Sequence, residues 1–211
     1  MKKRAYSPKE VIAMKHKIIP WDDKWRIPFG DVPDNETWFI SGASASGKSS
    51  FVMQLAKELC RHGSVLYMSY EEGISQSFQQ RLKRERMNEA QGSMRVATSD
   101  TYEELVKRLA RPKSAKFVII DSFQESRFTF EEVDDLVDRF PRKSFIFISQ
   151  EHKGQPSGKP ACRLRYKAGL KIRVVGYKAY CQGRFSSDAG CCYVIWDEGV
   201  IRTSNDNIQT N

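Results

Sequence analysis

The stretch that decides the fold is WFISGASASGKSSF, residues 38–51, in which an apolar segment leads through small residues to a lysine and two serines. Gly42 to Ser49 fit the pattern G-x-x-x-x-G-K-[ST], with four small residues between the two glycines. The pattern follows a short apolar strand, WFIS, and opens a helix that closes on a glycine, GKSSFVMQLAKELCRHG. A strand, a glycine-bearing turn and a helix in this order predict a phosphate-binding loop.

The residue types of this loop suit a nucleoside triphosphate. Small residues let the backbone curl round a phosphate with its N–H groups pointing inward, and the N-terminus of the following helix adds partial positive charge. We expect Lys48 to reach the β- and γ-phosphates of ATP and the Ser49 hydroxyl to ligate Mg²⁺. The predicted nucleotide-binding residues are Gly42, Ala43, Ser44, Ala45, Ser46, Gly47, Lys48, Ser49 and Ser50.

Carboxylates that such a site needs follow two other predicted strands. KFVIID places Asp121 at the end of an apolar strand, and SVLYMSYEEG places Glu71 and Glu72 just past another. Neighbouring parallel strands end at the same edge of a sheet, so we expect Asp121 to be a second Mg²⁺ ligand. One of the two glutamates would hold the attacking water, and we favour Glu71 with Glu72 as the alternative.

Gln150 is a further candidate because it ends the apolar strand KSFIFISQ. From that position its amide would sense the γ-phosphate and pass the nucleotide state to the segment that follows. A glutamine that merely ends a strand is the alternative interpretation.

Strands and helices alternate from residue 36 to residue 151, with further strands expected at SMRVAT and helices at GISQSFQQRLKRERMNEA, TYEELVKRLAR and FEEVDDLVDRF. Strands that are apolar throughout and alternate with helices predict a parallel sheet covered on both faces. After the loop EHKGQPSGKP we expect antiparallel edge strands at LKIRVVGYKAY, CCYVIWDEG and VIRTS. The predicted fold is therefore α/β, with a mainly parallel central sheet, flanking helices and antiparallel strands at the C-terminal edge.

The chain of 211 residues is expected to form one domain, a core of residues 36–203, between a basic N-terminal arm of residues 1–35 and a polar, disordered tail of residues 204–211. Within the arm, VIAMKHKII is a candidate short helix, and we expect Trp21, Trp25 and Phe29 to pack onto the core. Five cysteines without C-x-x-C spacing favour reduced thiols over a disulfide framework or a zinc site. With no apolar run long enough to span a bilayer, we expect a cytoplasmic protein.

The net charge of +9 suits a polyanionic partner. Residues 150–186 contain nine Lys or Arg against Glu151 alone. We expect single-stranded DNA to contact this segment through Lys153, Lys159, Arg163, Arg165 and Lys167, and Tyr166, Tyr177 or Tyr180 are candidates for stacking on bases. A solvated edge, with the tyrosines in the core, is the alternative.

Taken together, these motifs resemble the RecA-like ATPases, most closely the RadA and DnaB-type branch. The matching pieces are GASASGKSS, VLYMSYEEG, RLKRER, FVIIDS and FIFISQ, over about residues 36–185. The resemblance implies Mg-ATP, assembly into rings or filaments, single-stranded DNA as a frequent partner, and Glu71 as the catalytic carboxylate. CQGRFSS corresponds to the K-N-R-F-G motif of RadA-like proteins but lacks its lysine, so Arg184 is the residue expected to reach a neighbouring subunit's nucleotide.

The predicted function is an ATPase that binds single-stranded DNA in replication or recombination, as a homo-oligomer and with a possible protein partner from those processes. The alternative is an ATP-dependent switch that binds a protein partner, with turnover incidental. A small-molecule phosphotransferase comes third because the sequence gives no sign of a lid or an acceptor pocket.

Overall fold

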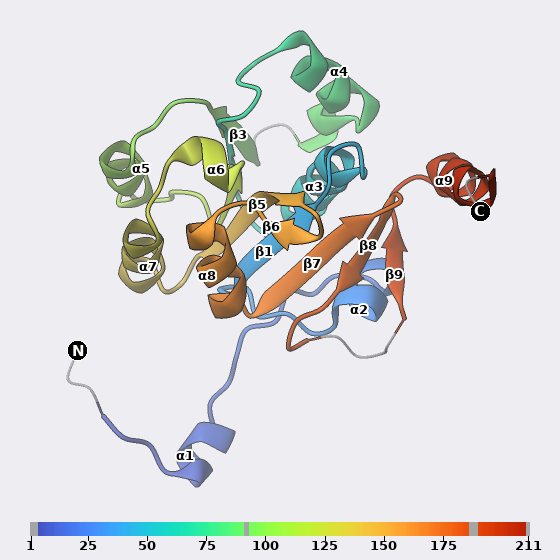
Figure 1. The fold of residues 1–211 in the computed structure, drawn as a ribbon. Helices are drawn as coiled ribbons and strands as arrows, with labels where there is room; N and C mark the ends of the chain where they lie inside the picture. Colours follow the sequence, from blue (N-terminus) through green and yellow to red (C-terminus); the bar gives the residue numbers. More distant parts are fainter. Residues whose placement is uncertain (1–3, 91–92, 186–189, 210–211) are drawn as a thin grey trace.

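The structure is a computed structural model that describes residues 4–90, 93–185 and 190–209. Its centre is a nine-stranded sheet, counted over the described residues, in the order β3-β2-β4-β5-β1-β7-β8-β9 with β6 paired to β5 (Figure 1). The strands are β1 Thr37–Gly42, β2 Val65–Ser69, β3 Met94–Ala97, β4 Phe117–Asp121, β5 Ser144–His152, β6 Gln155–Pro156, β7 Leu170–Val175, β8 Lys178–Cys181 and β9 Cys192–Val194.

The pairing confirms the predicted fold class. Strands β1 to β5 and β7 run parallel within the sheet, and β7, β8 and β9 pair antiparallel at the C-terminal edge. In register, Gly42 lies opposite Gln150 and Ser69 lies opposite Asp121. The residues at the carboxyl ends of β1, β2, β4 and β5 therefore meet at one edge, which we call the catalytic edge.

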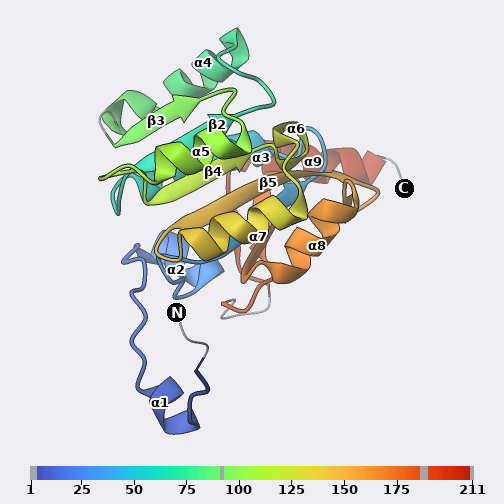
Figure 2. The ribbon, with the colours of Figure 1, turned by 90° about the vertical axis from the view of Figure 1, so that its left-hand side faces the viewer.

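Helices cover both faces of the sheet, and each face has its own hydrophobic core (Figures 1 and 2). Apart from α1, the helices on the two faces and at the C-terminus are α2 Asp23–Phe29, α3 Lys48–Leu59, α4 Gln76–Arg84, the 3₁₀ turn η1 Met87–Ala90, α5 Tyr102–Leu109, α6 Phe123–Ser126, α7 Phe130–Arg139, α8 Lys159–Lys167 and α9 Asp197–Gln209. Capping boxes begin α5 at Thr101 and α7 at Thr129, which explains why these two helices start where the sequence predicts.

The N-terminal region divides into an exposed and a buried part. Helix α1, Pro8–Ile12, has no buried residue and projects away from the body (Figure 1). It begins at Pro8 because Ser7 and Glu10 form a capping box. The predicted helix VIAMKHKII is wrong beyond Ile12, where α1 ends, and Ile18 instead forms an antiparallel bridge with Pro33. The expectation that Trp21, Trp25 and Phe29 pack onto the core is confirmed, although α2, on which Trp25 and Phe29 lie, was not predicted.

The C-terminal end differs from the prediction. VIRTS is not a strand, because α9 begins at Asp197 and runs to Gln209. Only Cys192–Val194 of CCYVIWDEG pairs in the sheet. Asp197 and Glu198 at the first turn of α9 complement the helix dipole, a signal that the strand interpretation overlooked. The last two residues of the predicted tail lie outside the described residues.

The segment expected to be a loop with basic strands contains a helix. Helix α8 has Pro160 in its first turn and buries Ala161 and Leu164 against the sheet face that also carries α7. Before it, Lys153 and Gly154 adopt positive φ values of 50° and 76° and turn β5 back onto the short β6.

All five cysteines are free thiols, in agreement with the sequence. Among the described residues, none of the helices combines the length and the hydropathy that a membrane span requires.

Candidate nucleotide-binding site

The loop between β1 and α3 has the backbone that its sequence predicts. Ala45 and Gly47 adopt left-handed φ values of 59° and 96°, and Gly47 is the N-cap of α3, so the helix begins at Lys48. A Cβ atom on Gly42 would lie 2.5 Å from the Val174 carbonyl oxygen and 2.8 Å from Ser46 Oγ. Glycine at 42 and 47 therefore lets the chain turn tightly under the helix N-terminus, where free N–H groups favour an anion.

The hydroxyls of the loop show which groups remain available for a ligand. Ser46 Oγ is buried and has no hydrogen-bond partner within the described chain. Because an unsatisfied buried hydroxyl is costly, a bound phosphate oxygen is a fitting acceptor for it. Ser50 Oγ accepts a hydrogen bond of 2.8 Å from Arg84 of α4, whereas Ser49, which follows Lys48, retains its hydroxyl for the predicted metal. These features fit a nucleotide phosphate with Mg²⁺.

Asp121 lies at the end of β4, on the catalytic edge. The Tyr67 hydroxyl of β2 donates a hydrogen bond to its carboxylate. Burial raises the pKa of the Asp121 carboxyl from 3.8 to about 6, and the negative charge of Glu71 adds to this rise. The Tyr67 hydrogen bond and the positive charges of Lys48 and Arg81 oppose it. A divalent cation would favour the ionised form, as expected of a carboxylate that ligates metal.

The two candidate glutamates have different surroundings. Glu72 is tied to α4, because its carboxylate accepts a 2.7 Å hydrogen bond from Arg81 and a 3.3 Å bond from Ser77. Glu71 is exposed, and its amide donates to the Asp121 carbonyl oxygen at 3.1 Å. This geometry leaves the Glu71 carboxylate at the catalytic edge and commits that of Glu72 to a neighbouring helix.

Gln150 joins the same group of side chains. Its Nε2 donates a 3.0 Å hydrogen bond to the Glu71 carboxylate. Its carbonyl oxygen accepts a bond of 3.0 Å from the Ser157 amide, just before α8 begins. The structure thus brings together Gln150, Glu71 and Asp121, which are far apart in the sequence.

A cleft of about 760 Å³ continues from the loop along α3. One wall is formed by Arg81 and Arg84 of α4 and another by Tyr177 and Trp196. The two aromatic rings meet edge to face with centroids 5.2 Å apart. The cleft offers cations and an aromatic surface next to the phosphate loop, which suits the nucleoside part of a nucleotide.

Tyr177 also holds the phosphate loop itself. The Tyr177 amide donates a 3.0 Å hydrogen bond to the Ser46 carbonyl oxygen, and its ring lies so close to Gly47 that a Cβ there would approach Tyr177 Cδ1 to 2.7 Å. Tyr177 was considered for base stacking in DNA, but it lies instead at the turn between β7 and β8, against the loop.

Arg184 lies at the other end of the sheet. Its amide donates to the Gly169 carbonyl oxygen, and the Gly169 amide donates to that of Thr37, the first residue of β1. The phosphate loop begins after the last residue of β1, about 17 Å away at the usual rise per residue. Arg184 is therefore not next to the phosphate loop of its own chain, as a residue that acts across a subunit boundary requires.

The basic segment is less available than its composition indicates. Arg163 pairs with Glu131 at 3.0 Å and lies 3.9 Å from the Phe130 ring, and Lys167 pairs with Asp134. Arg165 contacts Gln182 at 3.4 Å. Among the described residues, Lys153 and Lys159 have no ion pair, and Tyr166 is 82% exposed. The footprint left for a nucleic acid is thus smaller than predicted.

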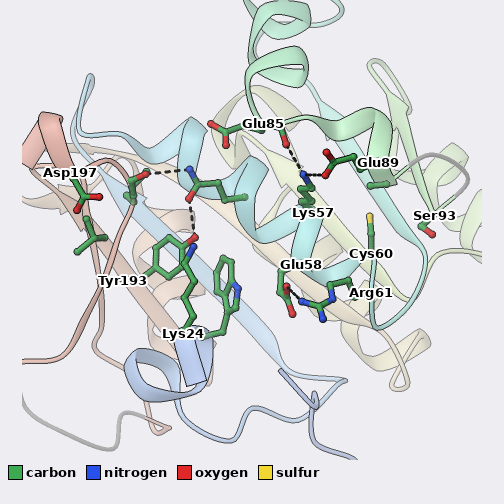
Figure 3. Close-up of a pocket in the computed structure, with 15 residues that line it drawn as sticks. Lys24, Lys57, Glu58, Cys60, Arg61, Glu85, Glu89, Ser93, Tyr193 and Asp197 are labelled. Carbon is green, nitrogen blue, oxygen red and sulfur yellow. Dashed lines mark hydrogen bonds and ion pairs between the residues drawn. The ribbon is translucent and has the colours of Figure 1, made fainter. Parts of the chain in front are cut away.

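A second hollow, of about 680 Å³, lies at the C-terminal half of α3 (Figure 3). The Tyr193 hydroxyl donates to Gln54 at 3.0 Å, and Glu58 pairs with both Arg61 and His62. Figure 3 shows Lys57 between Glu85 and Glu89, and Lys57 pairs with the Glu89 carboxylate. These groups satisfy one another, so the hollow has the character of a structural polar cluster.

Several residues at the site were not predicted as functional. Tyr67 is hidden in an apolar strand, and Trp196 lies in a segment interpreted as strand. Arg81 and Arg84 were noted only as part of the matching piece RLKRER, although their spacing of three places both on one helix face. That spacing is the signal that could have identified them.

Comparisons with known proteins agree with this architecture. A family model described as an AAA domain matches residues 10–140. No curated protein sequence matches the chain significantly. Among solved structures, the flagellar accessory protein FlaH from Methanocaldococcus jannaschii aligns with a TM-score of 0.61 and 18% identity, over 84% of this chain and 93% of FlaH.

A KaiC-like protein from the archaeon Pyrococcus horikoshii OT3 aligns with a TM-score of 0.59 and 13% identity, over 84% of this chain and 93% of its own. At these identities the two structures establish the shared fold alone.

Proposed function

Because the chain belongs to the AAA domain family and is a RecA-like P-loop ATPase, we propose that it binds Mg-ATP at residues 42–50 and hydrolyses it. The observation that carries this proposal is the hydrogen bond between Gln150 and Glu71 at the catalytic edge, beside Asp121. Strands β2, β4 and β5 bring these groups to the edge where β1 enters the phosphate loop.

Each residue has a role in the proposed reaction. Lys48 and the N–H groups of the loop neutralise the phosphates, and Ser49 and Asp121 would hold Mg²⁺, which supplies charge stabilisation when bound. The Glu71 carboxylate orients the attacking water, and Gln150, which shares its hydrogen bond, responds to the γ-phosphate. Glu72 is the weaker candidate because Arg81 and Ser77 already engage it.

We further propose that active sites are completed between subunits of a homo-oligomer. The distance of Arg184 from the phosphate loop of its own chain supports action on a neighbour's nucleotide. An arginine there would stabilise the charge that develops on the transferred phosphoryl group. A ring and a filament both provide such a contact.

Single-stranded DNA remains the proposed partner, with a footprint narrower than the whole basic segment. Lys153 and Lys159 flank the turn and β6 immediately after Gln150, and Tyr166 is exposed on α8. Phosphate contacts from these cations would give sequence-independent binding that depends on salt. A role in replication or recombination follows only if this binding occurs. The alternative function, a nucleotide-dependent switch for a protein partner, would use the same turn and α8.

Two measurements test the proposal. Lys48→Ala should abolish or greatly weaken ATP binding in isothermal titration while the circular dichroism spectrum stays unchanged, because Lys48 neutralises phosphate charge and is not a core residue. ATP turnover should rise when single-stranded DNA is added, and Lys153→Gln with Lys159→Gln should remove that rise but keep basal turnover. Unchanged nucleotide affinity in folded Lys48→Ala protein contradicts the site. An ATP turnover rate that does not change when single-stranded DNA is added favours the protein-partner switch.

A further inference from the structure

A hollow of about 590 Å³ lies at the end of the sheet opposite the catalytic edge. The loop after α5 and the loop after α7 form its walls. Half of its twelve lining residues are Lys or Arg and none is Asp or Glu. We call it the basic hollow, and its cations are Arg111, Lys113, Lys116, Arg139, Arg142 and Lys143.

Only part of this charge is compensated within the described chain. Lys116 pairs with Asp34 at 3.0 Å, and Arg139 pairs with Asp135 at 2.9 Å. The other four cations have no ion pair among the described residues. The C-termini of α5 and α7 each add about half a negative charge, which leaves about three positive charges uncompensated.

The cations of the basic hollow are held close together. Lys143 Nζ donates to neutral acceptors only, Ser114 Oγ at 2.8 Å and the Ala115 carbonyl oxygen at 2.6 Å. Burial and the charges of Lys116 and Arg142 lower the pKa of Lys143. Like charges held together in the folded chain are a cost that a bound polyanion would relieve.

The basic hollow is separate from the sites described above. Strands β4 and β5 begin beside it, at Phe117 and Ser144, and run away from it toward the catalytic edge. The N-terminal arm ends next to it, because Asn35 Nδ2 donates to the Pro141 carbonyl oxygen at 2.9 Å and Lys17 pairs with Asp34 at 3.4 Å (Figure 2).

We propose that the basic hollow binds the phosphate backbone of a nucleic-acid duplex. Nonspecific single-strand sites typically provide aromatic rings on which bases stack. The one aromatic side chain lining the basic hollow, Phe140, is half-buried, with Lys143 Nζ 6.0 Å from its ring centroid. Bases in a duplex are already stacked, so a surface of cations without exposed rings suits its backbone. This site is independent of the single-strand contact proposed above.

The test uses the full chain and a fluorescent 30-base-pair DNA duplex, with binding followed by anisotropy at several salt concentrations. In one variant the three exposed, unpaired cations of the basic hollow are neutralised (Arg111→Gln, Lys113→Gln, Arg142→Gln). The matched control neutralises three exposed cations elsewhere (Lys83→Gln, Arg95→Gln, Lys107→Gln). Each lost phosphate contact changes the log-log salt slope by about 0.9, so the first variant should flatten it by about 2.7 and the control should not.

Three outcomes would overturn the proposal. An unchanged slope in the basic-hollow variant excludes phosphate contacts there. Equal loss in the control variant assigns the binding to overall net charge. Competition by poly-glutamate as strong as by unlabelled duplex of equal charge makes an acidic protein the better partner. The Lys153 and Lys159 variant tests the two proposals separately. It should lose single-strand binding and keep duplex binding, because the single-strand contact belongs to the proposed function and the duplex contact to the basic hollow.

Discussion

Replacing Asp121 by asparagine should make the nucleotide-free protein more stable near neutral pH. In the folded chain the Asp121 carboxyl has a pKa of about 6, against 3.8 ordinarily, chiefly because it is buried. Above pH 6 the folded state therefore carries an ionised, poorly solvated carboxylate that the unfolded state hydrates freely. At about 1.4 kcal/mol per pH unit, the gap corresponds to about 3 kcal/mol of lost stability, an upper figure for the gain from Asp121→Asn.

The pH dependence has a definite sign. Well below pH 3.8 both states hold the proton, so the carboxyl costs the folded state nothing. As the pH rises from about 4 to 6, the unfolded state ionises first, and the free energy of unfolding of the parent falls. The difference between Asp121→Asn and the parent should therefore be small at pH 4, grow through this window and level off above pH 6.

Urea unfolding of both proteins at four pH values, without nucleotide or metal, measures this difference. Asp135→Asn is the matched control with the opposite sign, because Tyr102 and Arg139 lower the pKa of Asp135. That variant should be less stable than the parent at neutral pH. An Asp121→Asn variant that is no more stable than the parent at pH 7.5 would refute this reasoning. An equal gain in the free energy of unfolding at pH 4 would also refute it, because burial of the ionised Asp121 carboxylate would then not be the cause of that gain. Mg-ATP should stabilise the variant less than the parent, since the proposed metal ligand is lost.

Two further predictions concern turnover. Glu71→Gln should bind Mg-ATP with little change yet turn over at least tenfold more slowly in a phosphate-release assay, whereas Glu72→Gln should mainly loosen α4 through loss of the Arg81 pair; the reverse pattern would assign catalysis to Glu72. Arg184→Ala should reduce turnover far more than nucleotide affinity, and mixing it with Lys48→Ala protein should restore activity at mixed sites, while no recovery at any ratio would contradict action between subunits.

The sequence predicted the parts of the fold that depend on local pattern. The loop of residues 42–49 has its two glycines where a Cβ would clash, and Gly47 also has a φ of 96°, so the glycines of the motif follow from the backbone geometry. The apolar strand segments that lead to Asp121 and Gln150 had to meet at one edge once the sheet was parallel. The prediction missed α2, α8 and α9, which are formed by short segments without a clear helical period.

The basic segment shows why charge alone was a poor guide to binding. Arg163 and Lys167 are four residues apart, which places them on one face of a helix once α8 forms. That face meets the acidic α7, where Glu131 and Asp134 take up their charges. The cations of the basic hollow come instead from two loops nearly thirty residues apart, a juxtaposition that only the packed structure reveals.

The hydrogen bonds of β5 indicate which nucleic-acid surface should respond to nucleotide. Gln150 bonds Glu71 with its side chain and Ser157 with its carbonyl oxygen, and Gln124 Nε2 donates to the Ser157 carbonyl oxygen at 2.9 Å. A γ-phosphate that displaces Gln150 would therefore disturb the turn that carries Lys153 and the start of α8. The basic hollow lies near Ser144, six residues or about 20 Å back along the same strand.

We therefore expect ATP to change the affinity for single-stranded DNA at the turn after Gln150 and to leave duplex affinity at the basic hollow unchanged. Anisotropy titrations of each DNA with Mg-ATP and with Mg-ADP would measure this, and Gln150→Ala should remove the single-strand response alone, because it cuts the bond to Glu71 but touches nothing near Ser144. If the duplex affinity changes between Mg-ATP and Mg-ADP as much as the single-strand affinity does, the two surfaces are coupled and this prediction is wrong. The coupling would then run through subunit assembly and not through β5.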